Sequence, residues 1–286
     1  MTTTYAVAPW ALARSWLLIP ATDPKALTRA SASAADIVVI DIEDGIPEGR
    51  KKMAREVAGS WLENGRAWVR VNSRSTEFWE QDLAGLQRAP GLEGVMLAKT
   101  ESAGQITDTV AALGRELPVI ALVESARGLA YAPEIAETHG VVRIAFGSGD
   151  FRRDTGSGDS AIALAFARSQ LVVASRVAGI AAPIDGPCIS DDHGQLQVAA
   201  RLTADMGMTG KLCLHERQAE VANRTLSPDA DEVAWATAVV AELGADGSGI
   251  QDGSDRPALA RAHRILEVDH ALEYLGWKHQ YIDPTR

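Results

Sequence analysis

The segment VVRIAFGSGD, residues 141–150, is a short run of β-branched and apolar residues that stops at two glycines and a carboxylate, Asp150. Runs that are apolar at both alternating positions are typical of parallel strands covered on both faces. The sequence therefore predicts eight parallel strands, because seven similar runs stand elsewhere in the chain: SWLLIPA (15–21), DIVVIDIED (36–44), AWVRVN (67–72), GVMLAKT (94–100), PVIALVES (118–125), IAAPIDG (180–186) and GKLCLHE (210–216).

The segments between these runs have helical periodicity, so the chain alternates strand and helix. Asp23 and Pro24 supply an N-cap and a proline at the first helical position after the first run. A strand–helix unit repeated eight times favours a closed (β/α)8 TIM barrel. An open doubly wound sheet is the alternative, but the glycine-rich dinucleotide fingerprint is missing after the first run.

The last part of the chain forms an extension. Residues 228–243 and 256–277 have the pattern of two amphipathic helices, and a glycine-rich segment, GADGSGIQDGSD (244–255), separates them. We therefore expect a catalytic barrel domain at residues 1–226 and a C-terminal helical extension at 227–286.

Composition limits the partners and the compartment. A net charge of −10 argues against a nucleic-acid partner or an anionic membrane surface. The chain has no apolar run of about 20 residues, and its start, MTTTYAVAPWALAR (1–14), resembles a short arm and not a signal peptide. Cys188 and Cys213 have no metal-binding or disulfide spacing, which indicates a reducing cytoplasm.

Ionisable or amide side chains follow most of the predicted strands. In a barrel the carboxyl ends of the strands form one rim, where catalytic residues gather. Within this set we expect Asp41 and Asp185 to be structural and His215 to be a packing residue. The set consists of Asp41, Glu43, Asp44, Arg70, Asn72, Lys99, Glu124, Asp150, Asp185 and His215.

Two of these carboxylates suit a magnesium ion. Glu124 and Asp150 end neighbouring strands, which lie about 4.8 Å apart, and two carboxylates with open positions for water and substrate are the usual magnesium arrangement. Gly147 and Gly149 would let a chelating substrate approach the metal without a side chain in the way. Arg70 offers a planar fork for a substrate carboxylate.

With these residues assembled, the chain resembles the HpcH/HpaI aldolase and citrate lyase β-subunit family, in its branch acting on acyl-CoA thioesters. The resemblance runs in family order over about nine-tenths of the chain. It rests on RSWLLIPATDP (14–24), ADIVVIDIEDGI (35–46), VRVN (69–72), LAKTES (97–102), ALVESARG (121–128), FGSGDFRRDTG (146–156), APIDG (182–186), GKLCLHERQ (210–218) and SDRPALARAHRIL (254–266).

The resemblance implies a magnesium-dependent homotrimer of (β/α)8 barrels. By residue matching, Glu124 and Asp150 bind the metal and Arg70 holds the carboxylate of the oxo acid. The same matching places Arg14 and Arg29 where the family contacts coenzyme A. It places Asp255 on a C-terminal segment that closes over a neighbouring subunit's site, where it could act as a general acid or base.

The reaction we expect is carbon–carbon cleavage of a 3-hydroxyacyl-CoA, such as malyl-, citramalyl- or citryl-CoA, into an acyl-CoA and a 2-oxo acid. Three alternatives stay open: a condensing synthase with a thioesterase step, a citrate lyase β subunit that takes its thioester from an acyl-carrier protein, and a non-enzymatic binding module. The candidate proton-transfer residues are Asp255, Lys99, Glu43 and Asp44.

Overall fold

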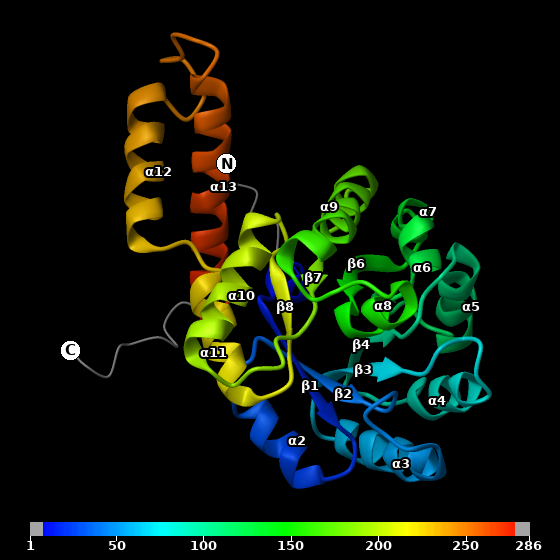
Figure 1. Cartoon of the computed structure of the whole chain (residues 1–286). Coiled ribbons are helices and arrows are strands. Elements are labelled where there is room, and N and C mark those ends of the chain that lie inside the picture. The colour runs from blue at the N-terminus through cyan, green and yellow to red at the C-terminus, as the bar shows by residue number, and fades with distance from the viewer. Residues whose placement is uncertain (1–7, 278–286) are drawn as a thin grey trace.

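The computed structural model describes residues 8–277, in which eight parallel strands close into a barrel in chain order (Figure 1). The last strand returns to the first, with Ser15 beside Lys211. This confirms the predicted (β/α)8 barrel, and the open-sheet alternative is wrong. The strands are β1 (Ser15–Pro20), β2 (Ile37–Asp41), β3 (Ala67–Val71), β4 (Leu92–Leu97), β5 (Val119–Val123), β6 (Val141–Phe146), β7 (Ile184–Asp185) and β8 (Gly210–Cys213).

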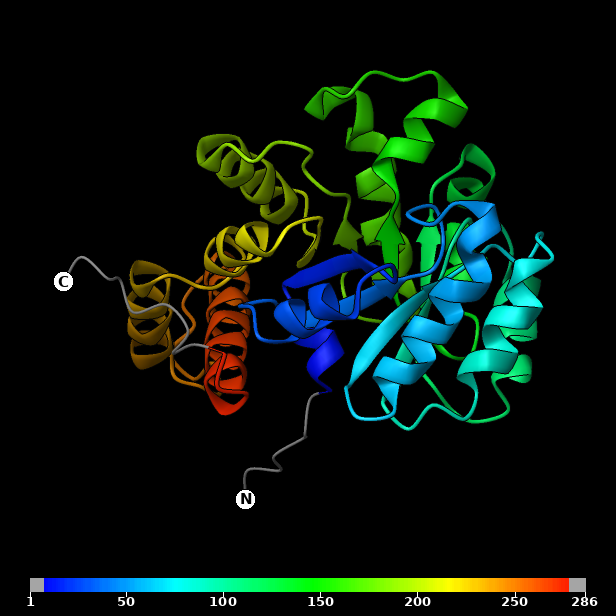
Figure 2. The same cartoon turned by 90° about the horizontal axis from the view of Figure 1, so that it is seen from below.

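Helices surround the barrel on its outside (Figures 1 and 2). The predicted cap of the second helix is present, since the Asp23 side chain accepts a hydrogen bond from the Lys25 N–H and Pro24 is the first helical residue. Among residues 8–277, no helix is long and apolar enough to cross a membrane. The helices before the extension are α1 (Pro9–Leu12), α2 (Pro24–Ser31), the 3-10 helix η1 (Glu48–Arg50), α3 (Lys51–Leu62), α4 (Phe78–Leu86), α5 (Ala103–Leu113), α6 (Ala126–Ala130), α7 (Ala132–Ala136), α8 (Ser148–Thr155), α9 (Ala161–Ala178), α10 (His193–Asp205) and α11 (Glu216–Thr225).

Alternate strand residues face the barrel interior and form an apolar core. Trp16 and Trp68 meet edge to face there, with ring centroids 5.3 Å apart. Leu18, Val39 and Leu122 belong to the same interior cluster, while the intervening strand residues pack against the outer helices. Because side chains alternate along a strand, the next inward-facing position after this core lies at the carboxyl-end rim.

The opposite, amino end of the barrel is closed by Arg143, which is fully buried in β6. Its guanidinium donates to the carbonyls of Trp10, Ala13 and Ala182 and to the Thr209 hydroxyl. Burial lowers the pKa of Arg143 to about 9. These hydrogen bonds fasten the residues around α1 to the base of the barrel, away from the rim.

The C-terminal helices α12 (Ala230–Leu243) and α13 (Asp255–Tyr274) pack side by side as a hairpin that stands out from the barrel (Figures 1 and 2). Asp229 and Glu232 form a capping box at the start of α12. The hairpin tip, residues 244–254, points away from the barrel in Figure 1. Both helices agree with the sequence prediction, whereas residues 1–7 of the predicted N-terminal arm and residues 278–286 lie outside the described residues.

Candidate active site

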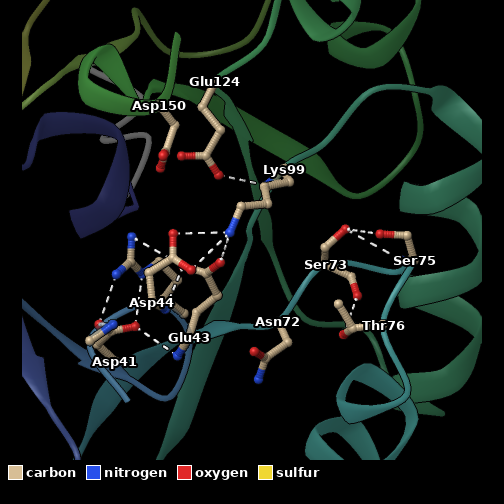
Figure 3. A network of polar contacts seen from close by, with 12 residues as sticks. Asp41, Glu43, Asp44, Asn72, Ser73, Ser75, Thr76, Lys99, Glu124 and Asp150 are labelled. Carbon is tan, nitrogen blue, oxygen red and sulfur yellow. Dashed lines mark hydrogen bonds and ion pairs between the residues drawn. The ribbon is translucent and has the colours of Figure 1, made fainter. Parts of the chain in front are cut away.

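The site begins where the inward-facing positions change from apolar to polar (Figure 3). Asp41 follows Val39 two residues later, Arg70 follows Trp68, and Glu124 follows Leu122, so each continues the interior side of its strand. These side chains form a polar layer directly above the apolar core. Loop residues Glu43, Asp44 and Lys99 and the helical residue Asp150 complete the layer.

Arg70 is held by Asp41 in a two-pronged ion pair. Its Nε lies 2.8 Å from Asp41 Oδ1 and its Nη2 lies 2.7 Å from Oδ2. Burial alone would lower the pKa of Arg70, but the charges of Asp41, Glu43 and Glu124 outweigh burial and raise it. Nη1 is less engaged, at 3.6 Å from Glu43 Oε2. Asp41 is therefore structural, as predicted, and Nη1 is the part of the fork left for a substrate carboxylate.

Lys99 forms ion pairs that connect the loop after β4 to the loop after β2. Its ammonium group contacts Glu43 Oε1 and lies 2.9 Å from Asp44 Oδ1. Burial would lower the pKa of Lys99, but hydrogen bonds and charge from the two carboxylates outweigh it and raise the pKa. Lys99 thus stays protonated near neutral pH and adds a positive charge to the rim.

The two predicted acid–base carboxylates of this loop differ in proton affinity. Burial raises the pKa of Glu43, although Arg70 and Lys99 partly oppose it. Burial would raise the pKa of Asp44, but hydrogen bonds with the Lys99 and Glu43 side chains outweigh burial and lower this pKa. Glu43 is therefore the stronger base of the pair, because a carboxylate with a raised pKa accepts a proton more readily.

Glu124 is a buried carboxylate without a matching cation. Its Oε1 accepts a 2.7 Å hydrogen bond from the Lys99 backbone N–H, and no Lys, Arg or His among residues 8–277 lies within ion-pair distance of it. Burial, together with the charges of Glu43 and Asp150, raises the pKa of Glu124 to about 8. The ionised form is thus held in place at a cost that a bound cation would offset.

Asp150 lies in the first turn of α8, and its carboxylate lies beside that of Glu124 in Figure 3. Arg153 pairs with it at 2.7 Å but is itself 74% exposed. Gly147 directly follows β6, and a Cβ there would lie 2.4 Å from Glu124 Oε2. Gly147 is therefore needed to make room for the Glu124 carboxylate.

The residues present fit a divalent cation with oxygen ligands. Two carboxylates, one of them buried and unpaired, face the same space. Within the described residues, no group of three or more His, Cys, Asp and Glu side chains forms a closed metal cage. A site with two protein carboxylates and open positions is the arrangement that magnesium uses when substrate and water complete its shell.

A cavity of about 490 Å³ opens beside this pair of carboxylates. It is lined by Glu124 and Asp150 and by loops that follow β3, β4 and β5. Ser73 and Ser75 lie on its β3 side, and Ser125 lies on its β5 side. The cavity is large enough for a small oxo acid next to the two carboxylates.

The two residues predicted to contact coenzyme A lie away from this cavity. Arg14 precedes β1 at the amino end of the barrel, where its buried guanidinium binds Asp36 at 2.7 Å and the Ser227 hydroxyl. Arg29 is exposed in the last turn of α2, and helices of a barrel run back toward the amino ends of the strands. Within one chain Arg14 and Arg29 therefore lie away from the rim, and their contacts with coenzyme A stay predictions.

Gly149 and Asp255 also do not line the cavity. Gly149 is exposed in the first turn of α8, with open space around its Cα, so it does not limit access to the carboxylates as Gly147 does. Asp255 begins α13 at the hairpin tip and accepts hydrogen bonds from the N–H groups of Gln251 and Asp252. Within one chain, the hairpin formed by α12 and α13 stands out from the barrel (Figure 1), so the expected role of Asp255 at a neighbouring subunit's site stays a prediction.

A buried network below the rim was not expected from the sequence. Lys51 of α3 donates to the carbonyls of Ile42 and Glu43 and to Asn72 Oδ1, and the Asn72 amide donates to Asp82. These contacts hold the loop that carries Glu43 in place. The burial of the Lys51 side chain reveals this role, and the sequence offers no signal that singles Lys51 out.

Comparison with known proteins agrees with this geometry. A family model described as HpcH/HpaI aldolase/citrate lyase matches residues 14–216, and one described as HpcH/HpaI aldolase C-terminal domain matches residues 231–273. A citrate lyase subunit beta-like protein of Mycobacterium tuberculosis is 33% identical over 266 residues, covering 88% of this chain and 93% of that protein. A (3S)-malyl-CoA thioesterase of Cereibacter sphaeroides is 30% identical over 275 residues, covering 88% and 95%.

A solved structure is also similar to this chain. The CitE protein of Mycobacterium tuberculosis, in complex with magnesium, acetoacetate and coenzyme A, matches with a TM-score of 0.75 and 31% identity, over 91% of this chain and 99% of that chain.

Proposed function

The chain belongs to the HpcH/HpaI aldolase/citrate lyase family, and from this premise we propose that it is a magnesium-dependent lyase that cleaves a 3-hydroxyacyl-CoA into an acyl-CoA and a 2-oxo acid. Malyl-, citramalyl- and citryl-CoA are the substrates to test first. The observation that carries the proposal is the buried, unpaired Glu124 carboxylate beside Asp150, with its pKa raised to about 8. Two similar proteins support it. One is named as a (3S)-malyl-CoA thioesterase, and the other is the CitE structure in complex with magnesium, acetoacetate and coenzyme A.

Glu124 and Asp150 would hold the metal. Magnesium bound there supplies a Lewis acid for the oxygen that changes from hydroxyl to carbonyl. Arg70 would orient the substrate carboxylate through Nη1, because its other two donors are committed to Asp41. That commitment fixes the plane of the guanidinium before substrate arrives, which lowers the entropy lost on binding.

Proton transfer is assigned by the differences in pKa within the rim. Glu43 would accept the hydroxyl proton, since its pKa is raised by burial. Lys99 is held protonated by Glu43 and Asp44, and it would stabilise the negative charge left on the substrate oxygen. Protonation of the departing acyl enolate needs a further acid. Asp255 of a second copy could supply it, because the hairpin carries Asp255 away from the rim of its own chain.

We propose a homotrimer in the cytoplasm. The observation that supports association is an exposed apolar stripe on α9, in which Ile162, Phe166, Val173 and Val177 are 61–86% exposed. Such a face on a surface helix is typical of an interface. Cys188 and Cys213, both free, suit a reducing compartment. Light scattering of the purified chain tests the oligomer directly, and a monomeric mass would contradict it.

A panel of malyl-, citramalyl- and citryl-CoA, incubated with the protein and magnesium, tests the reaction. Mass spectrometry should detect acyl-CoA together with glyoxylate, pyruvate or oxaloacetate. Release of free coenzyme A with the acid left intact would instead support a thioesterase, the activity named for one relative. Inactivity on every free thioester, with activity on a thioester of an acyl-carrier protein, would support the citrate lyase β-subunit alternative.

A further inference from the structure

We propose that the cavity beside Glu124 and Asp150 binds a hydroxyl-bearing substituent of the 2-oxo acid, and that Ser73 and Ser75 select this substituent against an alkyl group. The inference rests on the proposed function, because it names the class of oxo acid that the same site takes. The substrate class is then a 2-oxo acid with a hydroxylated carbon next to its carbonyl.

The lining of the cavity contains no apolar side chain. Three serines, one glutamine and six charged residues surround it. A cavity of similar size between the barrel and the hairpin, about 620 Å³, is instead lined by apolar side chains such as Ile265, Val268 and Leu272. A methyl or longer alkyl group gains less from a cavity without apolar side chains, because burial of apolar surface favours apolar neighbours.

Ser73 and Ser75 supply a free hydroxyl group to this cavity (Figure 3). Their Oγ atoms lie 2.9 Å apart, so one hydroxyl donates to the other. The Ser75 N–H also donates to Ser73 Oγ at 3.3 Å. Of the two hydroxyl protons, one is used within the pair, and the other has no acceptor among residues 8–277. Each serine hydroxyl has two acceptor lone pairs, so the pair can both donate to and accept from a ligand.

The turn that carries the two serines is fixed. The Thr76 hydroxyl donates to the Ser73 carbonyl at 2.8 Å, and the Thr76 N–H donates to the same carbonyl at 3.0 Å. Ser73 is only 3% exposed. The hydroxyl pair therefore meets a ligand in a preset position, which favours discrimination.

Gln105 offers donors on the same cavity. Its Oε1 accepts from the N–H groups of Glu101 and Ser102, at 2.6 and 3.2 Å. Its amide nitrogen is thereby turned away from these groups, and it has no acceptor among the described residues. Ser125, in contrast, already donates to Glu101 Oε1 at 2.6 Å. The lining thus presents unused donors at Gln105 and at the serine pair.

The charges around the cavity favour a neutral hydroxyl over a second carboxylate. Glu101 and Asp154 line it in addition to Glu124 and Asp150. Arg153 is engaged by Asp150, and Lys99 is engaged by Glu43 and Asp44. A second substrate carboxylate would therefore face two further acids, while the two cations of the lining, Lys99 and Arg153, already pair with acids.

The test compares glyoxylate, pyruvate, hydroxypyruvate and oxaloacetate as acceptors for condensation with acetyl-CoA, followed by mass spectrometry. Calorimetry measures the binding of the same acids in magnesium without acyl-CoA. We expect hydroxypyruvate to exceed pyruvate roughly tenfold to a hundredfold in kcat/KM and in affinity, since an alkyl group leaves the donors unpaired. Equal or better use of pyruvate, or a preference for oxaloacetate, would overturn the inference.

The two readouts separate this inference from the proposed function. Failure of every acid to condense would contradict the lyase proposal, while the binding preference would still decide the selectivity. A preference for hydroxypyruvate in binding supports the inference in that case, and its absence overturns it.

Variants assign the preference to the serines. Ser75→Ala and Ser73→Ala should each reduce the preference for hydroxypyruvate over pyruvate at least severalfold. Ser175→Ala is the matched control, because Ser175 is buried on α9 with a hydroxyl that has no partner. Ser75 is exposed, so its variant does not endanger folding. An unchanged preference in both serine variants would contradict their role.

Discussion

Two buried carboxylates of the barrel, Glu124 and Asp185, differ in how their charge is neutralised. Asp185, at the end of β7, faces outward and receives Arg168 Nε at 2.8 Å, Lys211 Nζ at 3.1 Å and the Thr203 hydroxyl at 2.8 Å. Glu124, at the end of β5, faces inward and receives one backbone N–H from Lys99.

The difference appears in their proton affinities. Burial would raise the pKa of Asp185, but Lys211 and Arg168 outweigh it and lower the pKa. The pKa of Glu124 is raised to about 8 by burial and by two neighbouring carboxylates. A cluster that is complete within the chain stabilises the fold, whereas an incomplete one marks a place for a ligand from outside.

Asp185→Asn should cause the largest loss of stability. The variant leaves Arg168 and Lys211 buried without their carboxylate, and breaking a buried pair in this way costs about 3–5 kcal/mol. Urea unfolding measures the change, and kcat per folded molecule should stay close to that of the wild type. A loss below about 1 kcal/mol would show that the cluster is not the structural element described here.

Glu124→Gln should instead reduce activity and leave stability intact. We expect turnover to fall by about 10³-fold, because several kcal/mol of metal-assisted stabilisation is lost. The free energy of unfolding in magnesium-free buffer above pH 8 should not fall, since the variant removes an unpaired buried charge. Activity assays and urea unfolding check the two halves. Retained activity at saturating magnesium would rule out Glu124 as a metal ligand.

Gly147→Ala should have a smaller effect on the same site. The new Cβ would lie 2.4 Å from Glu124 Oε2 and displace the carboxylate. We expect magnesium affinity to fall roughly tenfold to a hundredfold, as for changes in groups that orient metal ligands. Gly149→Ala is the control, because nothing lies within 4 Å of its added Cβ. Equal magnesium affinities of the two variants, measured by calorimetry, would contradict this distinction.

The smallest expected effect is on the pH dependence. Glu124 has a folded pKa of about 8, above its ordinary value of 4.5, so the folded state binds a proton that the unfolded state releases between these values. Stability without magnesium should therefore fall as pH rises from 4.5 to 8. Magnesium must displace the proton, so its affinity should rise about fivefold from pH 7 to pH 8, as the ionised fraction of Glu124 rises toward one half.

Asp185 serves as the reference for this pH dependence. Its pKa is lowered, so its stabilising contribution is present above the unfolded pKa and is lost as pH falls below it, in the acid range. It should contribute nothing between pH 6 and pH 8. Magnesium affinity that is flat over that interval would contradict the protonation state assigned to Glu124.

The sequence predicts the positions of both carboxylates, but it does not predict the difference in how their charges are neutralised. Each stands at the end of an apolar run, and the barrel follows from eight such runs. Alternation along β5 also places Glu124 inside. β7, however, has only two paired residues after Pro183, and the cations that neutralise Asp185 come from α9 and β8. Such partners depend on helix packing, which periodicity does not specify.

The same limit applies to residues that were assigned by motif position alone. Arg14 was assigned to coenzyme A by motif position, yet it precedes β1 and so lies at the amino end of the barrel. Asp255 was predicted to act at a neighbouring subunit's site, and its position at the start of α13 leaves that role dependent on a second copy. Ser73 and Ser75 were not singled out, because serines after a strand are ordinary turn residues until a cavity is seen beside them.

The most direct test of the account is a calorimetric magnesium titration of the wild-type protein and of Glu124→Gln at pH 8. The account predicts one site per chain in the wild type and loss of that site in the variant, with the fold unchanged by circular dichroism. Magnesium binding of equal affinity in both proteins, or none in the wild type, would contradict the central claim that the unpaired Glu124 carboxylate marks the metal site.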